Sequence, residues 1–219
     1  MTKRITAIEP QQKNPQRVNI YLDGQFAFGL AIIVAAWLKV GQDLGEEKIA
    51  SLKTADDGEI TYQKALHFLS YRPRASAEVY KNLLKRGISE SLVDETVKRL
   101  QDAGLVNDET FARAWVENRN SFHPRGKVAL QMELRRKGLS EEIVQSVLGT
   151  QVSDETLAFE AARKYARRLT GLDWQKFRQK LGSFLIRRGF SYTTLAPVVS
   201  EVWKETQTAD AGRILDNEE

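Results

Sequence analysis

The sequence has no cysteine and only two histidines among its 219 residues. The absence of cysteine excludes disulfide bonds, thiolate metal sites and cysteine nucleophiles. The histidines, His67 and His123, lie far apart in the sequence, and neither has an acidic or hydroxyl residue at the spacing of a catalytic motif. We therefore expect no catalytic residue, no metal site and no cofactor.

Long hydrophobic runs are also missing. The longest, LAIIVAAWL at residues 30–38, is much shorter than the roughly 20 residues that a membrane-spanning helix needs. The N-terminal residues MTKRITAIEPQQ lack the hydrophobic stretch and cleavage pattern of a signal peptide. Gly126-Lys127 lacks the upstream glycine of a phosphate-binding loop. We expect a soluble cytoplasmic protein that does not contact a membrane.

The sequence does contain a seven-residue motif that occurs three times. The copies are LLKRGIS at 83–89, LRRKGLS at 134–140 and LIRRGFS at 185–191. Their glycines, Gly87, Gly138 and Gly189, are 51 residues apart. A glycine just past a helix readily takes the left-handed backbone conformation, and two cations before it suit the negative end of the helix dipole. The motif predicts the end of one helix, followed by a second helix with the serine as its N-cap.

Apolar residues repeat in register with these glycines. The aligned trios are Val79, Leu130 and Leu181; Val93, Val144 and Leu195; and Val97, Leu148 and Val199. Such spacing is typical of helices that bury one face, and we predict three modules of three helices each. The expected helices lie near 61–71, 75–86 and 90–103; 108–121, 126–137 and 141–148; and 154–169, 174–188 and 192–206. Because units of about 50 residues bury little surface alone, we expect the modules to stack in an elongated array.

The first 59 residues do not follow the repeat. Asp23-Gly24 separates two stretches of alternating apolar and polar residues. This pattern predicts a β-hairpin with strands near 17–22 and 25–30. A third strand is expected near Ile5.

Two short helices are expected after the hairpin, at residues 31–39 and about 45–54. The polar stretch TADDGE at 54–59 is interpreted as a linker in which Asp56 and Asp57 are solvated. The fold class is therefore mainly α: three tandem three-helix repeats follow a small α+β segment that contains the hairpin. The expected domains are the N-terminal segment 1–59, the repeats 60–104, 105–152 and 153–206, and a disordered acidic tail at 207–219.

Positive charge is concentrated in the three repeats. They carry a net charge of +8, whereas residues 1–59 carry −1 and residues 207–219 carry −3. A basic repeat array suggests a polyanionic partner, with nucleic acid as the first candidate. A solvated helical surface is the alternative explanation of the same bias.

Nine basic residues are candidates to face a polyanion. They are Arg72, Arg74, Arg119, Arg125, Lys127, Arg163, Lys164, Arg167 and Arg168. The cations just before the glycine of each motif copy already have a role at a helix end and are weaker candidates. Like charges four residues apart, as in Arg163 with Arg167 and Lys164 with Arg168, mildly destabilise a helix, and a phosphate backbone would relieve this repulsion.

The tryptophans allow two interpretations. Trp115 follows Phe111 by four residues, so both lie on one helical face and core packing is favoured over base stacking. Trp174 and Trp203 lie near expected helix ends and fit either role.

Two adjacent stretches, GLVNDETFARAWVENR at 104–119 and RGKVALQMELRRKGL at 125–139, resemble the RecX family of regulatory proteins that act on the recombinase RecA. Weaker versions occur in the first module, as RPRASAEVYKNLLKRGI, and in the third, so the resemblance covers roughly residues 60–206. Two positions depart from the family pattern: Pro73 separates two arginines, and Val79 stands where leucine is usual.

The resemblance implies a curved, extended array of three-helix repeats that binds in the groove of the RecA filament on DNA. It implies damping of strand exchange, ATP hydrolysis and co-protease activity, with no catalytic residue in the regulator. We expect a monomer that contacts RecA and the backbone of single-stranded or duplex DNA through the nine basic residues. Replacing Arg163, Arg167 and Arg168 by alanine should then weaken inhibition. The alternatives are a stand-alone DNA-binding protein that uses its basic helix-turn-helix joints, and a purely protein-binding scaffold.

Overall fold

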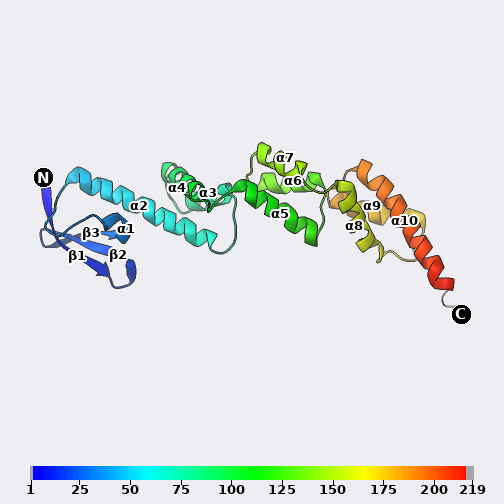
Figure 1. Cartoon of the computed structure of the whole chain (residues 1–219), viewed down its shortest axis with the longest axis horizontal. Helices are drawn as coiled ribbons and strands as arrows, with labels where there is room; N and C mark the ends of the chain where they lie inside the picture. The colour runs from blue at the N-terminus through cyan, green and yellow to red at the C-terminus, as the bar shows by residue number, and fades with distance from the viewer. Residues whose placement is uncertain (1, 216–219) are drawn as a thin grey trace. The chain divides into compact units, whose positions relative to one another are not determined.

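The computed structural model describes the backbone of residues 2–215 and the side chains of residues 2–208. The chain divides into two compact units. The first holds Met1–Arg74 and Glu78–Val106, and the second holds Ala75–Ala77 and Asn107–Glu219. The N-terminal sheet and most of the first module belong to the first unit, and the second and third modules belong to the second (Figure 1).

A small antiparallel sheet begins the first unit. Its strands, in the order β3-β2-β1-β4, are β1 (Thr2–Gln11), β2 (Asn14–Leu22), β3 (Gln25–Ala31) and β4 (Asp43–Gly45). The predicted hairpin is confirmed, because β2 pairs with β3 through a turn in which Asp23 and Gly24 have φ of 50° and 80°. Two positive φ values match the right-handed twist of paired strands. The predicted third strand is β1, whereas β4 is not foreseen by the sequence pattern.

One face of the sheet is closed by short helix α1 (Ile32–Ala35) and by α2 (Glu46–Leu69). Ile5, Ile20, Leu30 and Leu44 are buried in this core, where Leu52 of α2 joins them.

The prediction of a linker at 54–59 is wrong, because these residues lie inside α2, a single helix of 24 residues. Asp56, interpreted from the sequence as solvated, is buried against the sheet and accepts hydrogen bonds from the backbone of Ala31 (2.7 Å) and from Arg17 (2.7 Å). Glu59, one turn further on, pairs with Arg99 (2.9 Å). These tertiary contacts offset the low helix propensity of two aspartates and a glycine, so the helix continues.

The first module consists of the C-terminal part of α2 with α3 (Ser76–Lys85) and α4 (Glu90–Asp102). Val79, Leu83, Val93 and Leu100 are fully buried in its core, together with Ala65 from α2.

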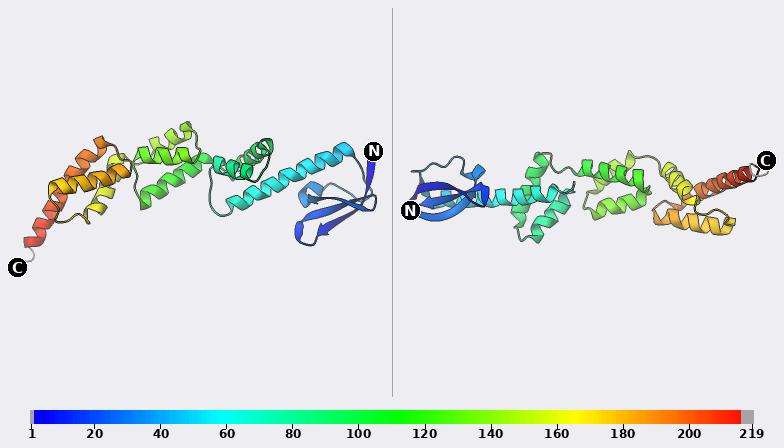
Figure 2. Two further views of the ribbon diagram at one scale, coloured as in Figure 1. Left: turned by 180° about the vertical axis from the view of Figure 1, so that it is seen from behind. Right: turned by 90° about the horizontal axis from the view of Figure 1, so that it is seen from below.

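The second module consists of α5 (Asp108–Phe122), α6 (Lys127–Arg136) and α7 (Glu141–Gly149). The third consists of α8 (Asp154–Ala166), α9 (Trp174–Arg187) and α10 (Tyr192–Leu215). The further views of Figure 2 show the three helices of each module side by side. The predicted tandem three-helix repeats are therefore confirmed. The exact limits of the domains stay predictions.

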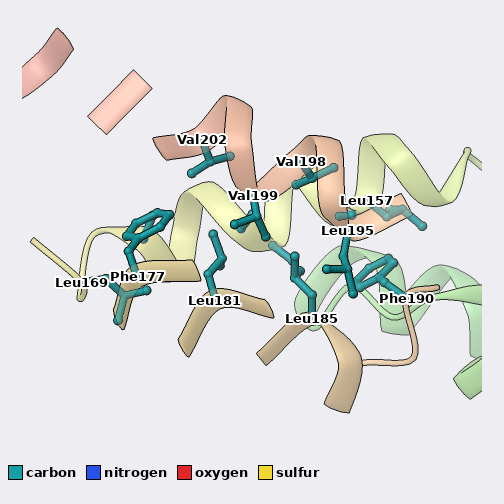
Figure 3. Close-up of a cluster of buried hydrophobic side chains, with 14 residues drawn as sticks. Leu157, Leu169, Phe177, Leu181, Leu185, Phe190, Leu195, Val198, Val199 and Val202 are labelled. Atoms are coloured by element: carbon teal, nitrogen blue, oxygen red, sulfur yellow. The ribbon is translucent and has the colours of Figure 1, made fainter. Parts of the chain in front are cut away.

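The core of the third module shows why the apolar register repeats. Leu157 of α8, Leu181 and Leu185 of α9, and Val198 and Val199 of α10 point toward one another (Figure 3). Each is at most 3% exposed. The aligned position in the second module, Leu130, is fully buried in the same way, so the 51-residue register carries one packing scheme.

The helix ends predicted from the seven-residue motif are confirmed. Gly87, Gly138 and Gly189 have φ of 77°, 85° and 82°. In the second and third modules the residue after the glycine also donates a backbone hydrogen bond back to the helix, from Leu139 to Leu134 and from Phe190 to Leu185. This pattern satisfies carbonyl groups that the helix itself leaves free.

The serine N-caps are confirmed in two modules of the three. Ser140 Oγ accepts a hydrogen bond from the backbone of Ile143 (3.4 Å), and Ser191 Oγ accepts one from Thr194 (3.2 Å). Ser89 is the N-cap residue before α4 but its side chain makes no such bond. Residues 89–91 are exposed, so solvent can satisfy these first amides instead.

Within the second unit, the start of α6 packs directly on the turn between α9 and α10. The backbone of Gly126 donates to the carbonyl of Arg188 (3.0 Å), and the backbone of Lys127 donates to Asp154 of α8 (3.0 Å). A Cβ atom on Gly126 would lie 2.7 Å from the backbone nitrogen of Phe190. Glycine at 126 thus permits a backbone-to-backbone contact between the second and third modules.

The acidic tail expected to be disordered at 207–219 differs from the structure, in which α10 continues to Leu215. Residues 216–219 lie outside the described residues. Gln207, Ala209, Ala211 and Arg213 are good helix formers and favour this extension, whereas Asp210 and Gly212 oppose it.

Candidate nucleic-acid interface

The nine basic candidate residues fall into both units. Arg72 and Arg74 lie in the first unit, and the other seven lie in the second. Their contacts divide them into side chains held by internal partners and side chains without an ion pair.

Arg72 and Arg74 occupy the loop between α2 and α3 and are both engaged inside the unit. Arg72 pairs with Glu78 (2.9 Å). Arg74 donates from Nε to the carbonyl of Phe68 (3.2 Å) and stacks on that ring, 3.7 Å from its centroid. Burial, and then the charge of Arg72, lower the pKa of Arg74. These contacts fix the loop and leave little of either cation for a ligand.

Arg119 and Arg125 converge on one carboxylate, Glu133 of α6. Glu133 accepts from Arg119 Nε (2.9 Å), pairs with Arg125 (2.8 Å) and accepts from the indole nitrogen of Trp115 (2.8 Å). Burial raises the pKa of Glu133, but the hydrogen bonds from Arg119 and Trp115 and the charge of Arg125 lower it more, so it lies below its usual value. Trp115 also stacks on Phe111, with ring centroids 5.9 Å apart. The expected packing role of Trp115 is thus confirmed.

Glu133→Gln is expected to destabilise the second unit by about 1–3 kcal/mol at pH 7, because it leaves two half-buried guanidinium groups without their carboxylate. The folded-state pKa is lowered, so this contribution is complete above the usual value of 4.5 and is lost as the pH falls through the lowered pKa. Urea unfolding followed by tryptophan fluorescence should show a difference from wild type that shrinks toward pH 3.

The matched control for this variant is Glu109→Gln, which removes an exposed carboxylate paired with Arg113 on α5. We expect little change, because exposed ion pairs contribute little to stability. Equal destabilisation by both variants would contradict the role assigned to Glu133.

The cluster at the C-terminal end of α8 and in the turn after it separates into one engaged arginine and three cations without an ion pair. Arg163 pairs with Glu205 of α10, with 2.8 Å between Nε and Oε2. Among the side chains that the structure describes, Lys164, Arg167 and Arg168 form no ion pair. The side chain of Lys127 at the start of α6 is likewise exposed and, within residues 2–208, forms no ion pair. Its charge nevertheless acts on Asp154, where burial raises the pKa of the carboxyl and Lys127 partly offsets that rise.

Lys164 and Arg168 line a groove of about 390 Å³, which we call the α8 groove. Residues from the C-terminal end of α5, from α8 and from α9 contribute to it, and Figure 1 labels these three helices. Its lining consists of residues 120–124, of Glu160, Ala161, Lys164 and Tyr165 from α8, of Phe184 from α9, and of Arg168 and Arg188, which follow the ends of these two helices.

Arg188 is the functional candidate that sequence reasoning missed. Because it directly precedes the glycine of the third motif copy, the sequence pattern predicts a role for it at a helix end. In the structure its guanidinium donates to the carbonyl of Pro124 (3.1 Å) and lies over Phe184, 4.6 Å from the ring centroid. Burial, and then the charge of Arg125, lower the pKa of Arg188. The equivalent positions in the other two copies, Lys137 and Arg86, are also cations, so no sequence signal distinguishes Arg188.

The candidate interface offers charge and aromatic surface. His67 contacts the hydroxyl of Tyr71 (3.1 Å), and His123 lines the α8 groove. Among residues 2–208, no group of three or more histidine and acidic side chains is arranged to hold a metal. Trp174 and Trp203 pack on each other, 5.6 Å between ring centroids, beside the core of the third module.

The fold and the interface define a protein of tandem three-helix modules with exposed basic side chains. Four family models of regulatory protein RecX match the chain between residues 3 and 194. They are the N-terminal domain at residues 3–45 and the first, second and third three-helix domains at 62–100, 107–148 and 153–194. The chain belongs to the RecX family.

Named relatives agree with this assignment. Regulatory protein RecX of Bacillus licheniformis is 32% identical, with 90% of this chain and 76% of the relative covered. RecX of Listeria innocua is 32% identical, with 97% and 80% covered. These proteins are named as regulators.

Solved structures show the same fold. A crystal structure of regulatory protein RecX matches with a TM-score of 0.75 at 30% identity, covering 88% of this chain and 96% of that one. RecX from Lactobacillus salivarius matches with a TM-score of 0.62 at 27% identity, covering 68% and 97%. In the described part of the chain, every helix is too short or too polar to cross a membrane.

Proposed function

We propose that the chain binds a RecA-type recombinase filament on DNA and inhibits or modulates its recombinase, ATPase and co-protease activities. In this proposal the chain acts in the cytoplasm as a monomer and is not itself an enzyme. It uses no cofactor, and the recombinase hydrolyses the ATP.

The observation that carries the proposal is the set of exposed cations in a member of the RecX family. Lys127, Lys164, Arg167 and Arg168 form no ion pair among the described side chains, so their charge is available to DNA phosphates or to acidic surface on a filament. Arg119, Arg125 and Arg163 meet internal carboxylates instead. Several weak contacts carried by one chain add together through effective concentration.

RecA ATP hydrolysis on single-stranded DNA is the direct test. The chain, added below one copy per RecA protomer, should reduce the rate. Lys164→Ala/Arg167→Ala/Arg168→Ala should need about tenfold more protein for half-inhibition, since each of the three solvent-exposed ionic contacts with the filament contributes roughly 0.5 kcal/mol. Arg163→Ala, on the same helix but paired with Glu205, is the control and should inhibit nearly as well as wild type.

Unchanged ATP hydrolysis with wild-type protein would sink the proposed function. Equal weakening by the triple variant and by Arg163→Ala would instead assign the effect to α8 as a whole rather than to its unpaired cations.

The alternative is a stand-alone DNA-binding protein, which the unpaired cations also favour. It predicts tight duplex binding without RecA and an affinity that falls with salt at a slope of about −0.9 per phosphate contacted. Measuring duplex binding with and without RecA, at two salt concentrations, separates the two. Tight duplex binding in the absence of RecA would favour the alternative.

A further inference from the structure

The α8 groove carries more positive charge than its own acidic residues can balance. Lys164, Arg168 and Arg188 line it, and Glu160 is its one acidic lining residue among the described side chains. Arg188 is half-buried, and its guanidinium meets a carbonyl and an aromatic ring rather than a carboxylate. A partly desolvated cation without a counter-ion attracts an anion more strongly than a solvated one.

Aromatic rings lie among these cations. Tyr165 and Phe184 stack with centroids 4.0 Å apart and planes 2° from parallel, and Arg188 covers Phe184. Phe122, the last residue of α5, is 65% exposed and also lines the groove. An exposed phenylalanine ring costs free energy in water, and beside cations it is the arrangement that single-stranded nucleic acids use, with phosphate on the cations and a base on the ring.

The size of the groove selects between kinds of nucleic acid. A volume of about 390 Å³ lies in the range of roughly 300–1,000 Å³ typical of small-ligand sites, enough for one nucleotide and too small for a duplex. A base inside a duplex is stacked on both faces and presents no face to Phe122, whereas a base in a single strand can turn outward.

We propose that the α8 groove binds one unstacked nucleotide of single-stranded DNA, with its phosphate at Lys164, Arg168 and Arg188 and its base against Phe122. This inference rests on the proposed function in one respect, that DNA is the polyanion the chain meets. An acidic peptide would satisfy the cations but would leave the exposed ring without a partner.

The test is binding of a fluorescently labelled oligothymidylate to the full chain without RecA, measured by anisotropy over a series of salt concentrations. Lys164→Ala/Arg168→Ala should weaken binding and make the salt dependence shallower by about 0.7 for each phosphate that is no longer neutralised. Phe122→Ala should weaken binding about fivefold or more with the salt slope unchanged, because stacking is not an ionic interaction. All three side chains are exposed, so these variants should fold.

The charge-matched control is Arg135→Ala/Lys176→Ala. It also removes two positive charges from the second unit, but these side chains pair with Glu141 and Asp173 outside the groove. We expect a smaller loss of affinity than for the groove variants.

Three results would overturn the inference. They are an equal loss in the control, no effect of Phe122→Ala, and competition by a glutamate-rich peptide as effective as that by unlabelled oligothymidylate. The proposed function is tested separately from this inference, because its measurement is the rate of RecA ATP hydrolysis. A chain that inhibits RecA but shows no groove-dependent DNA binding would refute the inference alone, and the reverse result would refute the proposed function alone.

Discussion

Gly126→Ala is expected to lower the free energy of unfolding of the second unit by about 3 kcal/mol, within the range for overpacking a rigid contact. Gly126 has φ of −69° and ψ of 157°, a conformation that alanine adopts without strain. The cost therefore comes from the new methyl group, which would meet the backbone of Gly189 and lie 2.7 Å from the nitrogen of Phe190. A backbone cannot rotate away as the end of a side chain can.

Urea unfolding followed by the fluorescence of Trp115, Trp174 and Trp203, all in the second unit, measures this loss. Gly45→Ala is the conformational control, and its effect is followed by the fluorescence of Trp37, which lies with it in the first unit. Gly45 also caps a helix, with φ of −77° and ψ of 162°, but a Cβ there would meet nothing within 4 Å. We expect Gly45→Ala to change stability by no more than about 1 kcal/mol. If Gly126→Ala unfolded at the wild-type urea concentration, the contact between α6 and the α9–α10 turn would be refuted.

Asp56→Asn should destabilise the first unit by about 2–3 kcal/mol, because it leaves the half-buried guanidinium of Arg17 without its counter-ion. The side chains of Asp56 and Arg17 are 8% and 22% exposed. Asp56 also accepts the backbone hydrogen bond of Ala31, which ties α2 to the end of β3. Thermal unfolding followed by circular dichroism should show the loss as an earlier transition.

The adjacent residue provides a matched control for this variant. Asp57 is exposed, so Asp57→Asn makes the same change of charge and shape in the same turn of helix without breaking a buried pair. Its effect should stay within about 0.5 kcal/mol. Similar melting of the two variants would show that the pair between Asp56 and Arg17 contributes nothing to stability.

The sequence alone determined the modular fold. The seven-residue motif with its glycine specifies a helix end, because a left-handed residue after a helix depends only on the few residues around it. The three helix ends lie at Gly87, Gly138 and Gly189 as predicted. The apolar register is equally local in origin, because a helix that must bury one face repeats its apolar residues at helical spacing. The turn at Asp23-Gly24 follows from the same kind of short-range chemistry.

Only the tertiary structure decided which polar side chains are used inside the protein and which remain for a partner. The sequence presents Arg163 and Lys164 as neighbouring cations of equal promise, yet Glu205, 42 residues from Arg163, neutralises one of them. Asp56 is read as solvated until its partner 39 residues away, Arg17, is placed beside it. Such pairs form between segments distant in the chain. Their geometry depends on how helices pack, and no local spacing encodes it.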